Sequence, residues 1–215
     1  MLDVHAPHES VHGWRDFFIH LATITIGLLI ALGLEGCVEW MHHRHLVHEA
    51  EASLHREIEN NSTILVQAVA NLQKEQKDLS HDVEVLKEII KTKKPPTKGD
   101  MAISVTFQGF ENISWKTAQS TGAFAYMPYQ LAREYSDIYS QQEQIDIATR
   151  QAVRDAIISL GPFLNKSKED PLPDPEEAVQ IKQHIEVLQG QMLLVDSQIK
   201  VLGDQYKRFL AAHPE

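Results

Sequence analysis

Residues Phe17–Leu34 read FFIHLATITIGLLIALGL and form an apolar run that contains no Asp, Glu, Lys or Arg. As a helix, about 18 residues at 1.5 Å rise cover roughly 27 Å, close to the thickness of the hydrocarbon core of a bilayer. A helix also satisfies its backbone hydrogen bonds internally, which lipid requires. The run therefore predicts a retained membrane anchor over residues 14–40, preceded by a polar tail over residues 1–13.

The residues around and within the run indicate how it would sit in lipid. Trp14 and Trp40 flank it, and indole rings favour the headgroup level, so we expect both to be interfacial anchors. Thr23, Gly27 and Ala31 recur every fourth residue and form a stripe of small side chains on one helical face. Such a stripe lets membrane helices approach closely, and it predicts a packing face, although ordinary membrane-helix composition would look similar.

Three other interpretations of the run remain open. A buried core helix of a soluble protein would have a similar composition. A cleaved signal peptide needs a basic start, whereas this N-terminal flank is acidic. A lipoprotein signal would place a lipid on Cys37, because Leu34–Cys37 resembles a lipobox, although Glu35 fits that box poorly.

The bulk properties exclude several classes of function. The chain has 215 residues and a net charge of −10, so no basic patch is available to replace phosphate counterions, and we expect no nucleic-acid partner. The single cysteine excludes an internal disulfide. Lys and Arg are nearly balanced on the two sides of the run, so positive-inside counting leaves the orientation open.

Beyond the anchor, the positions of Gly and Pro and the spacing of apolar residues predict an all-α protein. No Gly or Pro occurs between Cys37 and Lys94, and apolar residues recur there at intervals of three, four or seven residues. This spacing predicts a long juxtamembrane helix over residues 41–94 that continues the anchor. Asn60–Thr63 is its weakest point, where a kink is expected because these side chains compete for backbone hydrogen bonds. Pro95 ends the helix.

The remaining residues divide into a linker and a helical region. Residues 95–114 are expected to be a linker whose strand-like part packs as an extended loop. Within residues 115–215 we expect a short helix that ends at Gly122, a helix opened by Pro128 and a last helix that begins near Pro175. These helices are expected to pack on the long helix as an antiparallel helical bundle or coiled coil.

Two groups of side chains are candidate sites. Nine of the twelve histidines lie in the first 55 residues, and Glu39, His42, His45 and His48 lie near one helical face. They are a possible metal or pH-sensing cluster, but a polar collar at the interface is the favoured interpretation, and no metal or cofactor is expected. An aromatic region could line a ligand pocket or form a small core. The region runs from Phe107 to Tyr139, and the residues named for the possible pocket are Phe107, Phe110, Trp115, Tyr126 and Tyr129.

Catalysis is not expected. His8–His12 matches H-E-x-x-H, but it lies in a short tail between Pro7 and Gly13, so we treat the match as chance. No glycine-rich phosphate loop or nucleophile motif occurs. The leading hypothesis is a membrane-anchored scaffold or accessory subunit that acts by protein–protein contact with itself or another membrane protein. The alternatives are an envelope sensor that binds a small ligand in the aromatic region, and a histidine-based metal or pH sensor at the membrane surface.

Two segments carry a resemblance: WRDFFIHLATITIGLLIALGLE at Trp14–Glu35 and WKTAQSTGAFAYMP at Trp115–Pro128. The chain resembles uncharacterised bacterial single-pass membrane proteins that have an N-terminal anchor with an IGILIAL-like run, a long helix and a W-x-x-A-x-x-T-G-like segment. The likeness covers the anchor well and the rest loosely. It implies a place in the bacterial inner membrane and slightly favours a periplasmic C-terminal domain, and it transfers no functional residues.

Overall fold

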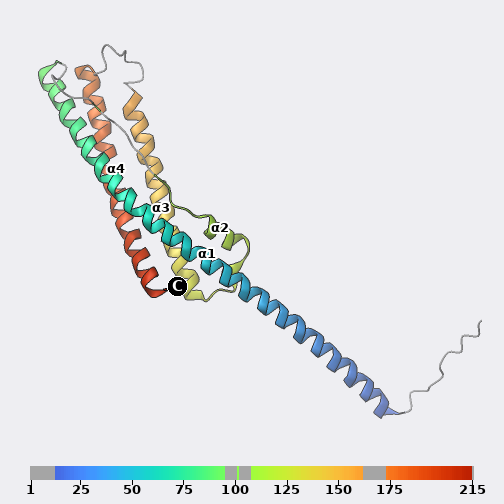
Figure 1. Cartoon of the computed structure of the whole chain (residues 1–215). Coiled ribbons are helices and arrows are strands. Elements are labelled where there is room, and N and C mark those ends of the chain that lie inside the picture. The colour runs from blue at the N-terminus through green and yellow to red at the C-terminus, as the bar shows by residue number, and fades with distance from the viewer. Residues whose placement is uncertain (1–12, 95–100, 102–107, 162–172, 215) are drawn as a thin grey trace, which may run out of the picture. The chain divides into compact units, whose positions relative to one another are not determined.

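A computed structural model describes residues 13–94, 101, 108–161 and 173–214 (Figure 1). These residues form four α-helices, a short 3-10 turn η1 (Ala123–Ala125) and no strand. The helices are α1 (Trp14–Thr92), α2 (Ile113–Ser120), α3 (Tyr129–Leu160) and α4 (Pro175–Ala212). The all-α prediction is confirmed. The chain divides into two compact units, residues 1–49 and 50–215, and α1 contributes to both.

In the first unit, α1 presents its apolar side chains to the surroundings. The large side chains from Phe17 to Leu34 are all exposed by about half or more of their surface, and both Trp14 and Trp40 are exposed too. Among the described residues, α1 is the one helix that is long and apolar enough to cross a membrane. The prediction of one N-terminal helix with the length and apolar composition of a membrane span is confirmed.

The helix α1 continues without interruption through Asn60–Thr63, where the sequence predicted a kink. The helix therefore accommodates the polar side chains there without a break. The Ser62 hydroxyl donates to the carbonyl oxygen of Glu59 at 2.7 Å, and the Asn61 amide bonds outside the helix. The helix ends at Thr92, close to the expected position, and Lys93 follows with φ of 53°.

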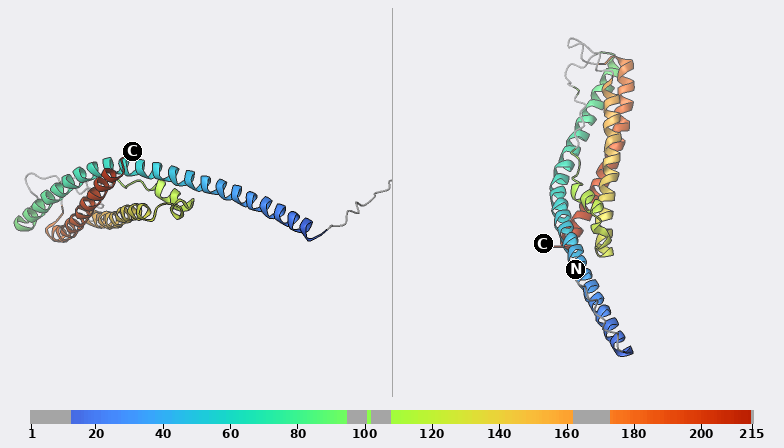
Figure 2. Two further views of the ribbon diagram at one scale, coloured as in Figure 1. Left: turned by 90° about the horizontal axis from the view of Figure 1, so that it is seen from below. Right: turned by 90° about the vertical axis from the view of Figure 1, so that its right-hand side faces the viewer.

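In the second unit, α3 and α4 run antiparallel (Figure 2). The Gln142 amide of α3 contacts the Tyr206 hydroxyl of α4, and further along α3 Asp155 contacts Gln191. Residue numbers therefore rise along α3 as they fall along α4.

The helix α4 is also antiparallel to the part of α1 that begins at Ala50. Leu65 lies against Gly203, and Ser80 accepts a hydrogen bond from the Gln189 amide at 3.2 Å. It follows that α1 and α3 run parallel, with α4 packed on both.

The core of this three-helix bundle follows an alternation of three and four residues. In α4 every buried residue fits that spacing, which places them on one face between two neighbours. They are Ala178, Ile181, Ile185, Leu188, Met192, Val195, Ile199, Leu202, Tyr206 and Phe209. Polar residues occupy some core positions of the other helices, and Glu57, Asn61 and Gln142 are three of them.

The helix ends use the residues that the sequence indicated. Asp174 and Glu177 form a capping box at the start of α4, with Pro175 in the first turn. Pro128 precedes α3. Gly122, with φ of 75°, separates α2 from η1 in a conformation that glycine adopts without strain.

Candidate functional site

The helix α2 has its N-terminus capped by a residue of another helix. Its own N-cap residue, Asn112, makes no side-chain capping bond. Instead the carboxylate of Glu57 in α1 accepts hydrogen bonds from the backbone N–H of Ser114 at 2.7 Å and of Trp115 at 3.4 Å. Because Glu57 is buried, these bonds and the partial positive charge of the helix end compensate the loss of hydration.

One turn further along α1, Asn61 holds the chain just before α2. Its Nδ2 donates to the carbonyl oxygen of Glu111 at 2.8 Å, and its Oδ1 accepts from the N–H of Glu111 at 2.8 Å. The fully buried Asn61 side chain therefore satisfies both polar groups of one residue. Together Glu57 and Asn61 fix residues 111–115 against α1.

An aromatic cluster completes this contact. The Trp115 indole stacks on the Tyr139 ring with centroids 4.7 Å apart and an interplanar angle of 12°, and its centroid lies 4.8 Å from that of Phe124. The Tyr139 hydroxyl donates to the Glu57 carboxylate at 2.6 Å. Burial, and then the hydrogen bond and negative charge of Glu57, raise the pKa of Tyr139, so the hydroxyl remains a neutral donor.

A second polar contact lies deeper in the bundle. The Nε2 of Gln142 donates to the Tyr206 hydroxyl at 2.9 Å, and Phe110 meets the Tyr206 ring edge-on at 6.4 Å. Burial raises the pKa of Tyr206. The buried Oε1 of Gln142 has no hydrogen-bond partner among the described residues.

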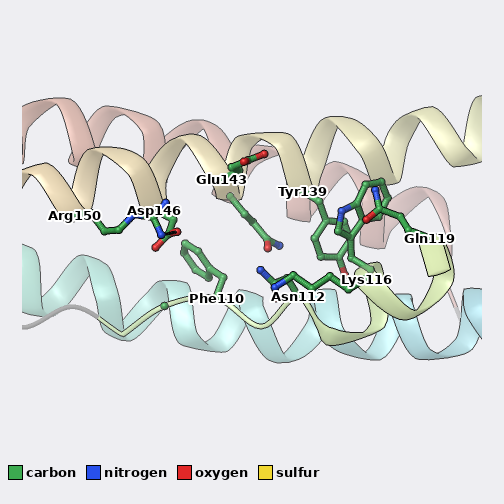
Figure 3. A pocket seen from close by; sticks show the side chains of 11 residues that line it. Phe110, Asn112, Lys116, Gln119, Tyr139, Glu143, Asp146 and Arg150 are labelled. Atoms are coloured by element: carbon green, nitrogen blue, oxygen red, sulfur yellow. Dashed lines mark ion pairs between the residues drawn. The ribbon is translucent and has the colours of Figure 1, made fainter.

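Phe110, Trp115, Tyr139 and Gln142 border a cavity of about 490 Å³ between α2, α3 and the segment that precedes α2 (Figure 3). Asp146 and Arg150 lie at one end of it and Gln119 at the other. Aromatic, amide and charged side chains share the lining. The lining residues are Gly109, Phe110, Asn112, Trp115, Lys116, Gln119, Tyr139, Gln142, Glu143, Asp146 and Arg150.

The structure brings together part of the aromatic region that the sequence singled out. Phe110 and Trp115 line the cavity. Tyr126 and Tyr129 are exposed and are not among its lining residues. Phe107 lies outside the described residues.

Three buried residues of the site that the sequence analysis missed are Glu57, Asn61 and Gln142. A signal was present, because each occupies a position where the three-and-four spacing requires a core residue. A polar residue at such a position indicates a buried polar contact, and the partners lie 50 to 82 residues away in the chain.

The histidine cluster in the first unit forms pairs along one helix. His43 lies 4.0 Å from the Glu39 carboxylate and 6.0 Å, ring to ring, from His42, while His45 lies 3.1 Å from Glu49. In the described part of the chain, no three or more His, Cys, Asp or Glu side chains are placed to hold a metal ion.

The stripe of small residues in the first unit lies on an exposed helix. The Thr23 hydroxyl donates to the carbonyl oxygen of Ile19 at 2.9 Å, so its polarity is satisfied within the helix. A Cβ added at Gly27 would meet no atom within 4 Å. At the end of the span, the Arg44 guanidinium lies 5.4 Å from the Trp40 ring centroid.

Comparisons with protein-family models, with curated proteins and with solved structures found no match to this chain.

Proposed function

We propose that this protein is a membrane-anchored helical scaffold that acts by protein–protein contact, and that its first partner is a second copy of itself. The proposal assigns lipid contact to the exposed apolar part of α1 and partner contact to the bundle. It involves no catalysis and no cofactor.

The observation that carries the proposal is an apolar groove of about 630 Å³ between α1 and α4 of the bundle. Leu65, Val66 and Val69 of α1 form one wall, and Leu210 lies on the α4 side. The Val66 side chain is 67% exposed. An exposed apolar groove of this kind is more typical of an interaction surface than of a solvated helix face.

The charges around this groove favour a second copy as the occupant. Asp204 and Lys207 both line it, and neither forms an ion pair within the described part of the chain. In an isologous dimer the same patch meets itself about a twofold axis, so that Asp204 of one copy faces Lys207 of the other. Val66 of each copy then packs in the groove of its partner.

The test measures the mass of the full chain in mild detergent by light scattering. The parent chain and a Gln67→Asp control, whose charge lies outside the groove, are expected to be dimeric, whereas Val66→Asp dissociates. Asp204→Lys and Lys207→Glu should each weaken the dimer, and the double exchange should restore it. A monomeric parent, or equal masses for Val66→Asp and Gln67→Asp, would overturn the proposed interface.

The proposal places the anchor in a bacterial inner membrane and the bundle in the periplasm. A protease added to intact spheroplasts is then expected to remove a C-terminal tag. A tag that becomes cleavable only on lysis would place the bundle in the cytoplasm and overturn this orientation.

A further inference from the structure

The Gln142 side chain, which lines the 490 Å³ cavity, lacks one of its hydrogen-bond partners. Gln142 is only 5% exposed. Its Nε2 donates a hydrogen bond to the Tyr206 hydroxyl, whereas its Oε1 has no hydrogen-bond partner among the described residues. Turning the amide over would leave its nitrogen unpartnered instead of its oxygen. A buried polar atom left in this state costs stability. The oxygen is shielded from solvent, so the Gln142 side chain must shift toward the cavity before a ligand can bond to it and remove that cost.

The charges that line the cavity occur in both signs. Arg150 and Asp146 pair at 2.7 Å, whereas Lys116 and Glu143 form no ion pair within the described residues. A purely anionic ligand would be repelled by the carboxylates, and a purely cationic one by Lys116 and Arg150. A ligand that carries one charge of each sign fits both.

The remaining wall is apolar and held in place. Trp115 and Phe110 provide ring surface, and Trp115 is fixed by the stack on Tyr139 and by the hydrogen bond to Glu57. Small-molecule sites are typically preformed, with volumes of about 300–1,000 Å³ and a few placed polar groups among aromatic side chains. The cavity meets that description.

We propose that this cavity binds a small zwitterion of the amino-acid class with an apolar side chain. The carboxylate of the ligand pairs with Lys116, and its side chain packs on Trp115 and Phe110. Its ammonium group donates to Oε1 of Gln142 once that side chain has shifted toward the cavity. The site lies apart from the groove between α1 and α4, so it does not depend on the proposed self-association.

The fluorescence of Trp115 provides a direct test. The chain has three tryptophans, so replacing Trp14 and Trp40 by Phe leaves Trp115 as the sole indole of the full chain in detergent. Titration with L-phenylalanine should give a saturable change in its emission. Phenethylamine lacks the carboxylate and 3-phenylpropionate lacks the ammonium group, so each should bind about tenfold or more weakly, equivalent to about 1.4 kcal/mol.

Two variants connect the affinity to named side chains. Lys116→Met alters an exposed residue, and it should weaken L-phenylalanine about tenfold while leaving phenethylamine unchanged. Gln142→Met keeps the side-chain length but removes the amide, and should weaken L-phenylalanine more than 3-phenylpropionate. Lys77→Met, on α1 outside the cavity, is the matched control and should bind as the parent does.

Three results would overturn the proposal. The first is no saturable change up to about 10 mM L-phenylalanine, a concentration above which any affinity is too weak to indicate a built site. The second is equal affinity for the amino acid and both of its singly charged analogues. The third is a Lys116→Met protein, folded by circular dichroism, that binds L-phenylalanine as tightly as Lys77→Met does.

Discussion

Glu57 of α1 accepts a hydrogen bond of 2.6 Å from the hydroxyl of Tyr139 in α3, and the same carboxylate caps α2. One buried acid therefore joins three helices. Glu57 has no basic partner in the described residues, so its hydrogen-bond donors and the N-terminus of α2 compensate its burial.

Replacing Glu57 by Ala should destabilise the protein by about 3 kcal/mol, because Ser114 N–H, Trp115 N–H and the Tyr139 hydroxyl lose their acceptor in a buried place. Glu57→Gln keeps one acceptor oxygen and should cost less. The measurement is urea unfolding followed by circular dichroism. Glu88→Ala, at an exposed position of the same helix, is the control and should change stability by less than about 0.5 kcal/mol. Equal losses for the two alanine variants would show that the cap contributes nothing.

Asn61→Ala should release the chain before α2 from α1. The N–H and carbonyl of Glu111 lose both of their partners, so the amide of Glu111 should exchange with deuterium much faster, and stability should fall by about 2 kcal/mol. Hydrogen exchange of a peptide that covers residues 108–116 measures the effect. Asn60→Ala alters an exposed neighbour and should leave that exchange unchanged. Unchanged protection in Asn61→Ala would contradict the role assigned to the amide.

The helices could be predicted because their signals are local. Pro128, Pro175 and Gly122 set helix ends through their own backbone preferences, and the apolar spacing of α4 shows its buried face without knowledge of any partner. The long uninterrupted stretch before Pro95 predicted the continuous part of α1 for the same reason.

The site could be predicted only in part because its contacts are not local. Asn61 was expected to weaken α1, since an amide inside a helix usually competes with the backbone, but here a segment 50 residues away receives it. Closeness in sequence also grouped Tyr126 and Tyr129 with Trp115, whereas helical geometry selects Tyr139, three turns into α3. The packing of α2 on α3 decides which aromatic side chains come into contact. No single residue of the sequence indicates that packing.

High pH should unfold the bundle. Burial raises the pKa of Tyr135, Tyr139 and Tyr206 above the usual value of 10.0, so the fold keeps these phenols protonated. Above pH 10 the unfolded chain releases these protons and the folded chain does not. The stability contributed by the neutral phenols is therefore complete below pH 10 and falls as pH rises beyond it.

The measurement is the melting temperature between about pH 8 and pH 12, with tyrosinate absorbance recorded alongside. Tyr135→Phe removes one of the three groups and should make the alkaline decline shallower, whereas Tyr129→Phe, at an exposed position, should follow the parent. A parent whose melting temperature is constant across the range, or a Tyr135→Phe curve that matches it, would argue against the shifted phenols.

Replacing either of two glycines by alanine should shift the melting temperature, in opposite directions for the two positions. Gly190 lies exposed within α4, and a Cβ there would meet no atom within 4 Å, so Gly190→Ala should gain about 1 kcal/mol from helix propensity and raise the melting temperature by about 2–4 °C. Gly122 has φ of 75°, a left-handed conformation that costs an alanine about 1–2 kcal/mol, so Gly122→Ala should lower it although space is equally free there. Calorimetry measures the melting temperature of both variants. Because a Cβ meets no atom at either position, a difference between them reports the effect of backbone conformation and not of packing. If both substitutions shifted the melting temperature in the same direction, Gly122 would not hold the turn between α2 and η1 in the way its geometry indicates.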